Sequence, residues 1–478
     1  MFSFTSIEQY HAQLQEGNIT CVQAVEYYLQ RINATRHLNA FVQVYADEAV
    51  QRARYLDEKR KNGNPLKKLH GVVIGIKDVI CYKDHPVTAS SAILKDFHSL
   101  YSATCVDRLL DEDAIIIGHL NCDEFAMGST NENSVYGKVL NAADETRVPG
   151  GSSGGSAVAV QAGLCMLSLG TDTGGSVRQP ADFCGIIGLK PTYGRISRYG
   201  LVAYASSFDQ VGIFGSEVRD VALLLEIMSG ADEYDSTASQ IPVPSYSSQI
   251  DENKKYRIAF FEEALDHPSM DSEISIAIKK QVEQLRTDGH EVDPVPFDLL
   301  DYIVPAYYIL TTAEASSNLS RYDGVKFAHR VSVGKGEMVS LTDFYMRTRS
   351  TGFGREVKRR IMLGTFVLSA GYYDAYFTRA QKVRKLVSDK MDLVFRDYDF
   401  IILPTSPVTA FKTGEKMTDP IAMYLADIFT VMANLAGIPA ISLPLFKHPN
   451  GMPFSLQVMA NRFNEVSLLR LSNHLLKK

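Results

Sequence analysis

Hydrophobic and polar positions alternate with different spacings along the chain. From about residue 6 to residue 63 the apolar positions repeat every three to four residues, and Ile7, Tyr10 and Leu14 share one face. This spacing predicts two or three amphipathic helices. We therefore expect residues 1–65 to form an N-terminal helical segment.

Short apolar runs rich in β-branched residues follow this segment. Residues 70–80 (HGVVIGIKDVI) and 114–121 (AIIIGHLN) have the continuous hydrophobicity of buried parallel strands, and we expect a helix between them. The uncharged residues 156–167 predict a helix buried against a sheet, and LSLGT at its end predicts a strand. This alternation indicates the α/β class.

Strand and helix patterns return in the second half of the chain, where residues 305–395 are largely helical. We expect strands at 256–263, 290–297, 398–407, 438–445 and 454–460, and helices at 272–286 and from Glu465 to the end.

We expect one domain over residues 1–478, with a core over residues 66–240. Residues 250–478 would supply the rest of the sheet together with the helical insertion at 305–395. The Pro/Ser-rich residues 241–249 are the best candidate for a linker, although strands on both sides of it could share one sheet.

Composition excludes several classes of protein. The 478 residues are 45% hydrophobic and 22% charged, an ordinary globular balance. The net charge is −6, without a block of like charge, which argues against a broad nucleic-acid surface. Six cysteines form no CxxC or Cys/His cluster, so we expect neither a metal site nor a redox pair, and a reducing cytoplasm fits best. The sequence contains no secretory signal and no apolar run of membrane-spanning length.

Glycine is concentrated in one part of the chain. Twelve of the 33 glycines lie between Gly150 and Gly200. The first cluster, VPGGSSGGSAVAV (148–160), contains no phosphate-binding Gly-x-x-x-x-Gly-Lys pattern. It does match the Gly-x-Ser-x-Gly pattern of α/β-hydrolases at Ser153, but the residues before it do not form an apolar strand.

The second cluster, GTDTGGSVRQPA (170–181), suggests an oxyanion hole. A turn over Thr173, Gly174, Gly175 and Ser176 would aim consecutive backbone N–H groups at one point beside a serine nucleophile. The competing interpretation is that this segment is simply a loop.

The serine would need a base. Lys77 closes the apolar run GVVIGIK, and burial there would lower its pKa far enough for the amine to accept a proton. Histidine is the alternative base, although none lies between His119 and His267. A further pair of short motifs, at Ser332–Lys335 and Lys412–Gly414, imitates penicillin-recognising enzymes but lacks the Ser-Asp-Asn that should lie between them.

Taken together, GIKD (75–78) and the two serine–glycine clusters resemble the amidase signature family in order and spacing. The resemblance implies a Ser, cis-Ser, Lys triad with Ser176 as nucleophile, Ser152 as bridging serine and Lys77 as base. It also implies an α/β fold in which helices flank a central twisted mixed sheet, with no metal ion.

Four further segments, at 123–137, 314–325, 352–376 and 426–444, resemble the glutaminase chains of glutamyl-tRNA(Gln) amidotransferases within that family. This implies a glutaminase in a heterotrimer with B and C subunits. The ammonia would pass to a partner that uses ATP and Mg²⁺ to amidate Glu-tRNA(Gln). The tRNA would be held mainly by the partners, and this chain would bind no cofactor itself.

Free glutamine carries two charges that the site must pair. By resemblance, Arg360 is the candidate for the α-carboxylate and Asp427 for the α-ammonium, although Arg359 cannot be separated from Arg360 by sequence. Ser129 and either Tyr307 or Tyr308 would lie nearby.

Two alternatives differ in what they require. A free-standing amidase acting on another amide would share the triad without needing the Arg360 and Asp427 pair, and a non-catalytic protein could use the glycine-rich loops to hold an anion. The chain also departs from the family before the first cluster. Asn141-Ala142-Ala143-Asp144 stands where the family usually has Asn-Pro-Trp-Asp, and the chain has no tryptophan.

Overall fold

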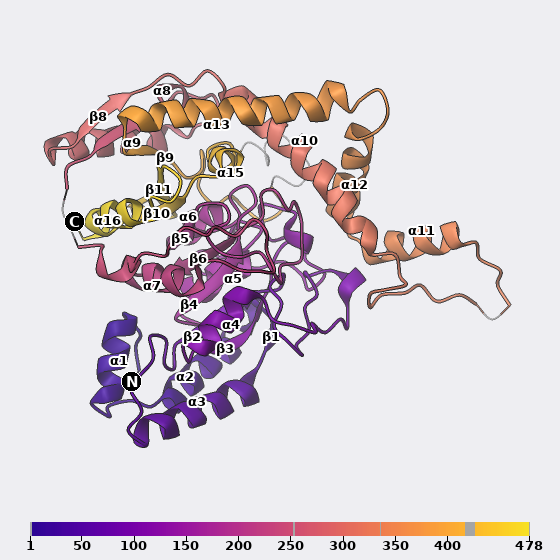
Figure 1. The fold of residues 1–478 in the computed structure, drawn as a ribbon, viewed down its shortest axis with the longest axis horizontal. Coiled ribbons are helices and arrows are strands. Elements are labelled where there is room, and N and C mark those ends of the chain that lie inside the picture. The colour runs from indigo at the N-terminus through magenta and orange to yellow at the C-terminus, as the bar shows by residue number, and fades with distance from the viewer. Residues whose placement is uncertain (1, 252–253, 335, 416–425, 478) are drawn as a thin grey trace.

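The strands of this computed structural model, which describes residues 2–251, 254–334, 336–415 and 426–477, form one mixed sheet (Figure 1). Parallel pairs lie on either side of an antiparallel middle, and one edge strand adds a further antiparallel pair. The expected α/β fold with a mixed sheet is confirmed. The eleven described strands lie in the spatial order β1 (Phe41–Val44), β3 (Ile115–Leu120), β2 (Val73–Lys77), β4 (Leu167–Thr171), β6 (Val211–Gly215), β5 (Ile187–Lys190), β10 (Ala440–Lys447), β11 (Pro453–Ala460), β9 (Phe400–Pro404), β7 (Arg257–Phe260) and β8 (Glu291–Pro294).

Helices surround this sheet. In the first half they are α1 (Ile7–Gln15), α2 (Cys21–Ala34), α3 (Ala46–Lys61), α4 (Thr104–Asp111), α5 (Gly154–Gln161), α6 (Arg178–Cys184) and α7 (Val218–Met228). In the second half they are α8 (Glu262–Leu265), α9 (Ser272–Thr287), α10 (Leu300–Asn318), α11 (Leu341–Gly352), α12 (Arg355–Val367), α13 (Arg379–Asp397), α15 (Val431–Ala436) and α16 (Glu465–Leu476). The pairs α5–α6 and α7–α16 each pack on the central strands, whereas α12 and α13 each pack on α10. Figure 1 shows α11 projecting from the body beyond α12.

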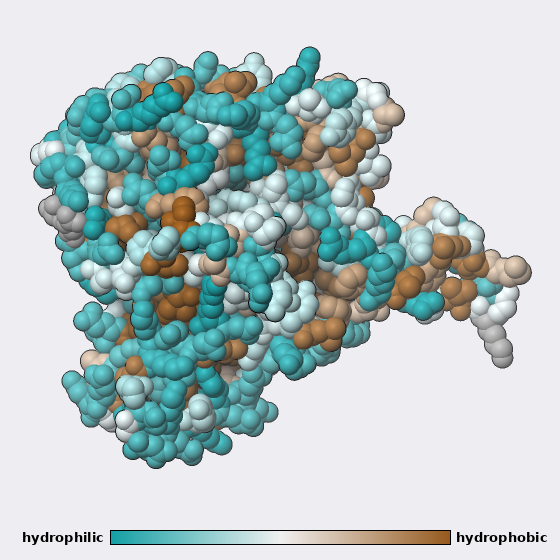
Figure 2. Space-filling model, in the orientation of Figure 1, coloured by the Kyte–Doolittle hydropathy of each residue, from teal (hydrophilic) through white to brown (hydrophobic). Residues whose placement is uncertain are grey.

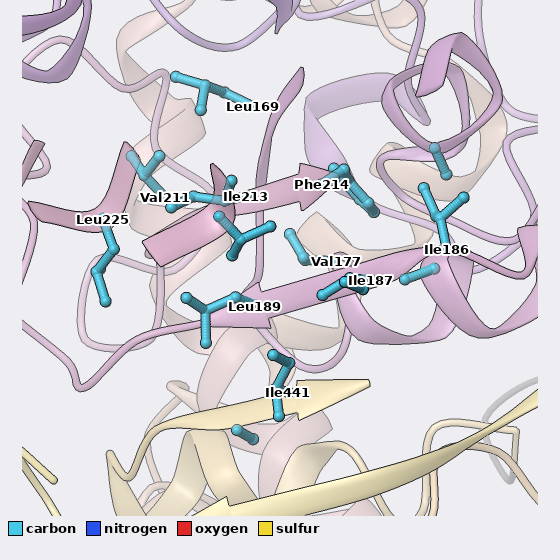
Figure 3. Packing of buried hydrophobic residues seen from close by; sticks show 14 of the residues in the cluster. Leu169, Val177, Ile186, Ile187, Leu189, Val211, Ile213, Phe214, Leu225 and Ile441 are labelled. Carbon is cyan, nitrogen blue, oxygen red and sulfur yellow. The ribbon is translucent and has the colours of Figure 1, made fainter. Parts of the chain in front are cut away.

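The centre of the sheet is held by a row of apolar side chains that crosses four strands. Leu169, Ile213, Leu189 and Ile441 are consecutive cross-strand partners on β4, β6, β5 and β10 (Figure 3). All four are fully buried. Such directly opposed β-branched and aliphatic pairs fix strand register, and this row joins the first half of the chain to the second.

Most predicted elements are confirmed, and the differences have physical causes. The N-terminal segment is not purely helical, because Phe41–Val44 forms the edge strand β1 against β3. Four residues are too few to interrupt the helical spacing on either side. The helix predicted over residues 156–167 ends at Gln161, where a turn containing Gly163 begins. Strands β5 and β6 were not predicted, and residues 241–249 do separate segments that share one sheet.

Candidate active site

Lys77 is the last residue of β2 and is fully buried. Its Nζ atom donates hydrogen bonds to Ser152 Oγ at 2.7 Å, Ser153 Oγ at 2.9 Å and Thr171 Oγ1 at 2.9 Å. Burial lowers the pKa of Lys77 from 10.5 to about 8, while the nearby acidic groups oppose that shift. Three hydroxyl groups thus surround a lysine that loses its proton more readily than an exposed one.

Sheet topology explains why these groups meet. Strands β2 and β4 are parallel neighbours, so Lys77 and Thr171 close their strands at the same edge. The carboxyl edge of parallel strands is the usual place for a site in an α/β fold. Ser152 and Ser153 immediately precede α5, which packs on β2 and β4.

The first serine cluster passes very close to the polypeptide that surrounds it. A Cβ atom at Gly151 would lie 2.1 Å from Asp123 Oδ2 and 2.6 Å from the Thr130 nitrogen, so only glycine fits there. The peptide bond between Gly151 and Ser152 is cis. The Ser153 N–H donates to the Ser176 carbonyl at 3.3 Å, which joins the two serine-bearing turns.

Ser176 begins the segment that leads into α6 and is 9% exposed, whereas Ser152 is fully buried. The structure therefore places the two serines on adjoining turns and leaves Ser176 more accessible. This difference suits the roles proposed below, because a nucleophile must be reached by substrate.

A buried ion pair braces the second turn. Asp172 accepts hydrogen bonds from the N–H groups of Gly175 at 2.9 Å and Val177 at 3.2 Å. Arg178 contacts the same carboxylate at 2.9 Å and 3.1 Å. Although burial raises the pKa of Asp172, the Arg178 guanidinium holds it at about 2. The carboxylate is thus ionised and fixed behind the turn.

This brace changes one expectation for the oxyanion hole. The Gly175 N–H, one of the four expected there, donates to Asp172 instead. Within the described part of the chain, the N–H groups of Thr173, Gly174 and Ser176 donate to no protein group. These three groups remain as candidate donors.

Tyr307 of α10 packs directly on the turn. A Cβ atom at Gly174 would lie 2.4 Å from the Tyr307 hydroxyl oxygen, so the phenol rests against bare backbone. Thr430, which lies in the other half of the chain, donates a hydrogen bond from its Oγ1 to the Gly174 carbonyl at 2.8 Å. Residues 256 positions apart therefore shape one small volume around Gly174.

An acidic group and an arginine stand beside this volume. Ser129 Oγ donates to Asp427 Oδ2 at 2.6 Å. Burial raises the pKa of Asp427 to about 7, and both Ser129 and the charge of Arg360 act against that rise. The influence of Arg360 on Asp427 places the two candidate recognition residues in one electrostatic environment.

Arg360 is buried between aromatic rings. Its guanidinium lies 5.5 Å from the Tyr204 ring centre and 5.3 Å from that of Tyr308, and it donates to Glu356 at 2.7 Å and to the Tyr204 hydroxyl at 2.7 Å. Its side chain is 4% exposed, whereas that of Arg359 is 39% exposed. Arg360 is therefore the arginine that faces the interior.

A model of the family described as Amidase matches residues 23–469 of the chain. The chain belongs to the amidase family. A relative from Pelodictyon phaeoclathratiforme, named as the A subunit of glutamyl-tRNA(Gln) amidotransferase, is 49% identical over 99% of both chains. The protein of the same name from Chlorobaculum tepidum is 48% identical over 99% of this chain and 98% of its own.

Solved amidase structures have the same fold. The crystal structure of the A subunit of glutamyl-tRNA(Gln) amidotransferase from Thermotoga maritima aligns with a TM-score of 0.79 and 39% identity, covering 98% of this chain and 93% of that one. A peptide amidase from Stenotrophomonas maltophilia aligns with a TM-score of 0.82 and 26% identity, covering 99% and 97%.

The loop in which this amidase departs from the usual Asn-Pro-Trp-Asp borders a hollow. Asn141 is buried and donates to the Phe183 carbonyl at 2.9 Å, so the loop is still anchored. Ala142 and Ala143 line an open cavity of about 690 Å³ together with Tyr28 of α2. The approach loop is therefore anchored, and its two alanines lie at an open cavity beside α2.

Several residues of this amidase site were missed from the sequence. Thr171 and Ser153 contact Lys77 directly, and Tyr204 and Glu356 hold Arg360. A usable signal existed only for Asp172 and Arg178, which are the two charges in the otherwise uncharged second cluster. The described residues contain no group of three or more metal-ligating side chains. No helix among them is both long and apolar enough to cross a bilayer.

Proposed function

We propose that this chain is the glutamine-hydrolysing component of a glutamyl-tRNA(Gln) amidotransferase. The observation that carries the proposal is the buried Lys77 beside Ser152, adjoining the Ser176 turn, in a chain nearly half identical to proteins named as the A subunit of that enzyme. The partners would be the B and C subunits of a cytoplasmic heterotrimer. ATP and Mg²⁺ would be used by one of these partners, and residues 1–478 would act as one domain.

In the proposed acylation step, neutral Lys77 accepts the proton of Ser152 Oγ across their 2.7 Å contact. Ser152 in turn accepts the proton of Ser176 Oγ, which attacks the side-chain amide carbon of glutamine. The N–H groups of Thr173, Gly174 and Ser176 stabilise the negative charge that develops on the amide oxygen.

Completion of the reaction uses the same residues in reverse. The proton returns through Ser152 to the leaving nitrogen, which departs as ammonia, and the product is an acyl group on Ser176. Water, deprotonated by the same relay, then hydrolyses this ester to glutamate. The ammonia would be used by the partner to convert activated Glu-tRNA(Gln) into Gln-tRNA(Gln).

Recognition of glutamine would depend on its two charges. Arg360 would pair with the α-carboxylate and ionised Asp427 with the α-ammonium, with Ser129 orienting Asp427 and Tyr307 and Tyr308 forming the walls. Burial of Arg360 and Asp427 supports these roles, because a desolvated charge on the protein favours a ligand of opposite charge.

The second candidate is a free-standing amidase with the same triad. The fold similarity to a peptide amidase supports this second candidate. A buried arginine and a buried acid beside the site favour a zwitterionic amino acid over a neutral amide. The two candidates therefore make different demands on the substrate.

One assay separates them. Ammonia release from glutamine is measured with the chain alone and with the B and C subunits, ATP and Glu-tRNA(Gln), and Gln-tRNA(Gln) formation is measured in parallel. We expect stimulation by the partners, and a loss of about 10³-fold or more in Ser176→Ala. Ser320→Ala, at an exposed serine, is the control. Fast hydrolysis of neutral amides without stimulation would favour the free-standing enzyme.

A further inference from the structure

The outer face of α12 and the turn after it carry an unusual set of exposed side chains. Figure 2 shows hydrophobic residues near the segment that connects α12 to α13. The side chains here are Met362, Leu363, Phe366, Tyr372, Tyr373 and Tyr376, each between 39% and 66% exposed. We call these six residues the α12 patch. Contiguous exposed apolar groups on this scale mark an interaction surface more often than scattered ones do.

The aromatic members of the patch form a built cluster. The ring centres of Phe366 and Tyr372 lie 4.4 Å apart, and those of Phe366 and Tyr376 lie 5.8 Å apart. These contacts hold residues 372–376 against the end of α12. Because the rings are ordered before any partner arrives, little side-chain freedom is lost on binding.

The opposite face of the same helix belongs to the proposed glutamine site. Glu356, Arg360 and Gly364 repeat every four residues and face inward. A Cβ atom at Gly364 would lie 1.9 Å from the Thr312 carbonyl oxygen, so α12 is pressed tightly on α10. One rigid helix therefore carries Arg360 on one side and the α12 patch on the other.

Charge indicates what kind of surface would cover the patch. Basic residues predominate on the adjoining helix ends, and Asp374 is the one acidic residue exposed between them in this described stretch. The basic residues are Arg355, Lys358 and Arg359 on α12 and Arg379 and Lys382 on α13. An occupant with apolar side chains flanked by carboxylates would be complementary. A second copy of the same basic face would not be.

We propose that the α12 patch docks an apolar segment of a partner protein, flanked by acidic residues, in the amidotransferase. This inference rests on the function proposed above. A protein fits better than a nucleic acid, because the patch is centred on Met362, Leu363 and Phe366, whereas nucleic-acid surfaces are dominated by phosphate contacts. Because α12 also carries Arg360, any effect of docking on glutamine affinity would be matched by an equal effect of glutamine on docking.

The test uses the full-length chain and the purified B and C subunits. Affinity is measured by calorimetry, and assembly by size-exclusion chromatography, for wild type and for Phe366→Ser/Tyr372→Ser. We expect binding to weaken at least tenfold in the double variant. Leu393→Ser, at a 51% exposed leucine of α13 outside the patch, and Met338→Ser, at a fully exposed methionine, should bind as wild type does. Thermal melting verifies that each variant folds.

A charge variant tests the second half of the proposal. Arg355→Glu/Lys382→Glu should weaken binding of the partners and reduce its dependence on salt. Glutamine hydrolysis in the isolated chain should be unchanged in both double variants, because all four substituted side chains are exposed on the surface.

Each other outcome overturns the proposal in a recognisable way. If the patch variant binds the partners as tightly as the control variants do, the α12 patch is not a docking surface, and the proposed function is unaffected. If the patch variant keeps its partners but loses self-association, the patch binds a second copy of this chain. If it keeps its partners but the isolated chain loses tRNA binding, the patch binds nucleic acid. Failure of the wild-type chain to bind B and C would overturn the proposed function together with this surface.

Discussion

The carboxylate of Glu124 accepts the backbone N–H of Gly354 with both oxygens, at 2.9 and 3.1 Å, across 230 residues of sequence. Gly354 is the N-cap residue of α12. Glu124 belongs to the same loop as Ser129, so this contact ties the loop beside the serine clusters to the helix that carries Arg360. Burial raises the pKa of Glu124 to about 7, and its ionised form also interacts favourably with the helix dipole.

Removing this contact should loosen the glutamine site. We expect Glu124→Ala to raise the KM for glutamine about tenfold with a smaller change in kcat, because the Gly354 N–H loses its hydrogen-bond partner, and a typical hydrogen bond contributes about 0.5–1.5 kcal/mol. Steady-state kinetics checks this. Glu145→Ala, at an exposed glutamate paired with His37, is the matched control. A wild-type KM in Glu124→Ala would show that α12 is held by its other contacts alone.

The activity should depend on the protonation of Lys77. With a pKa of about 8, this lysine is mostly protonated at pH 7 and mostly neutral at pH 9. Only the neutral amine can accept a proton, so kcat/KM for glutamine should rise about tenfold between these pH values. The pH profile of the steady-state rate measures it. Lys77→Ala should lose roughly 10²- to 10⁴-fold in kcat, and a flat wild-type profile would contradict the assigned role.

Glutamine affinity should carry a separate pH dependence from Asp427. Burial raises its pKa to about 7, so the carboxylate is mostly protonated at pH 6 and mostly ionised at pH 8. Since only the ionised form pairs with an ammonium group, KM should fall about tenfold over this interval. Asp427→Asn should have a high KM at both pH values. If the variant keeps the wild-type dependence, another group controls it.

The Asp172–Arg178 pair should matter for stability as well as for activity. Arg178→Met leaves Asp172 buried without its partner, and we expect the free energy of unfolding to fall by about 3–5 kcal/mol. Urea denaturation measures this. Because the folded pKa of Asp172 is depressed to about 2, its stabilising contribution is present above the ordinary pKa of about 4 and is lost as pH falls toward 2. Lys279→Met, at an exposed surface pair, should change stability little.

Elements of the fold could be predicted from the sequence where their signal lies within a short stretch of the chain. The strands ending at Lys77 and Thr171 are short apolar runs whose hydrophobicity is visible without any partner. The edge strand at Phe41–Val44 was missed because its pairing with β3 is supplied from a distant part of the chain, and its own four residues carry too little signal. Strand β5 is equally short.

The candidate site followed the same rule. Lys77, Ser152 and Ser176 stand in motifs that resemble the amidase signature, and that resemblance implies that they lie close together. The hydrogen bond from the Gly175 N–H to Asp172 could not be anticipated, because it depends on the rotamer of one side chain in a tight turn. Nor could the sequence choose between Arg359 and Arg360. That choice depends on which side of α12 faces Tyr204, and only the packing of α12 on α10 decides it.

The row of side chains that crosses β4, β6, β5 and β10 joins two halves with different tasks. Lys77, Ser152 and Ser176 lie in the first half of the chain, whereas Arg360 and Asp427 lie in the second half. The proposed catalytic residues and the proposed glutamine-binding residues are thus encoded in separate stretches of the gene. Because Ser129 and Tyr204 of the first half contact Asp427 and Arg360 of the second, a change of substrate would need matched substitutions in both halves.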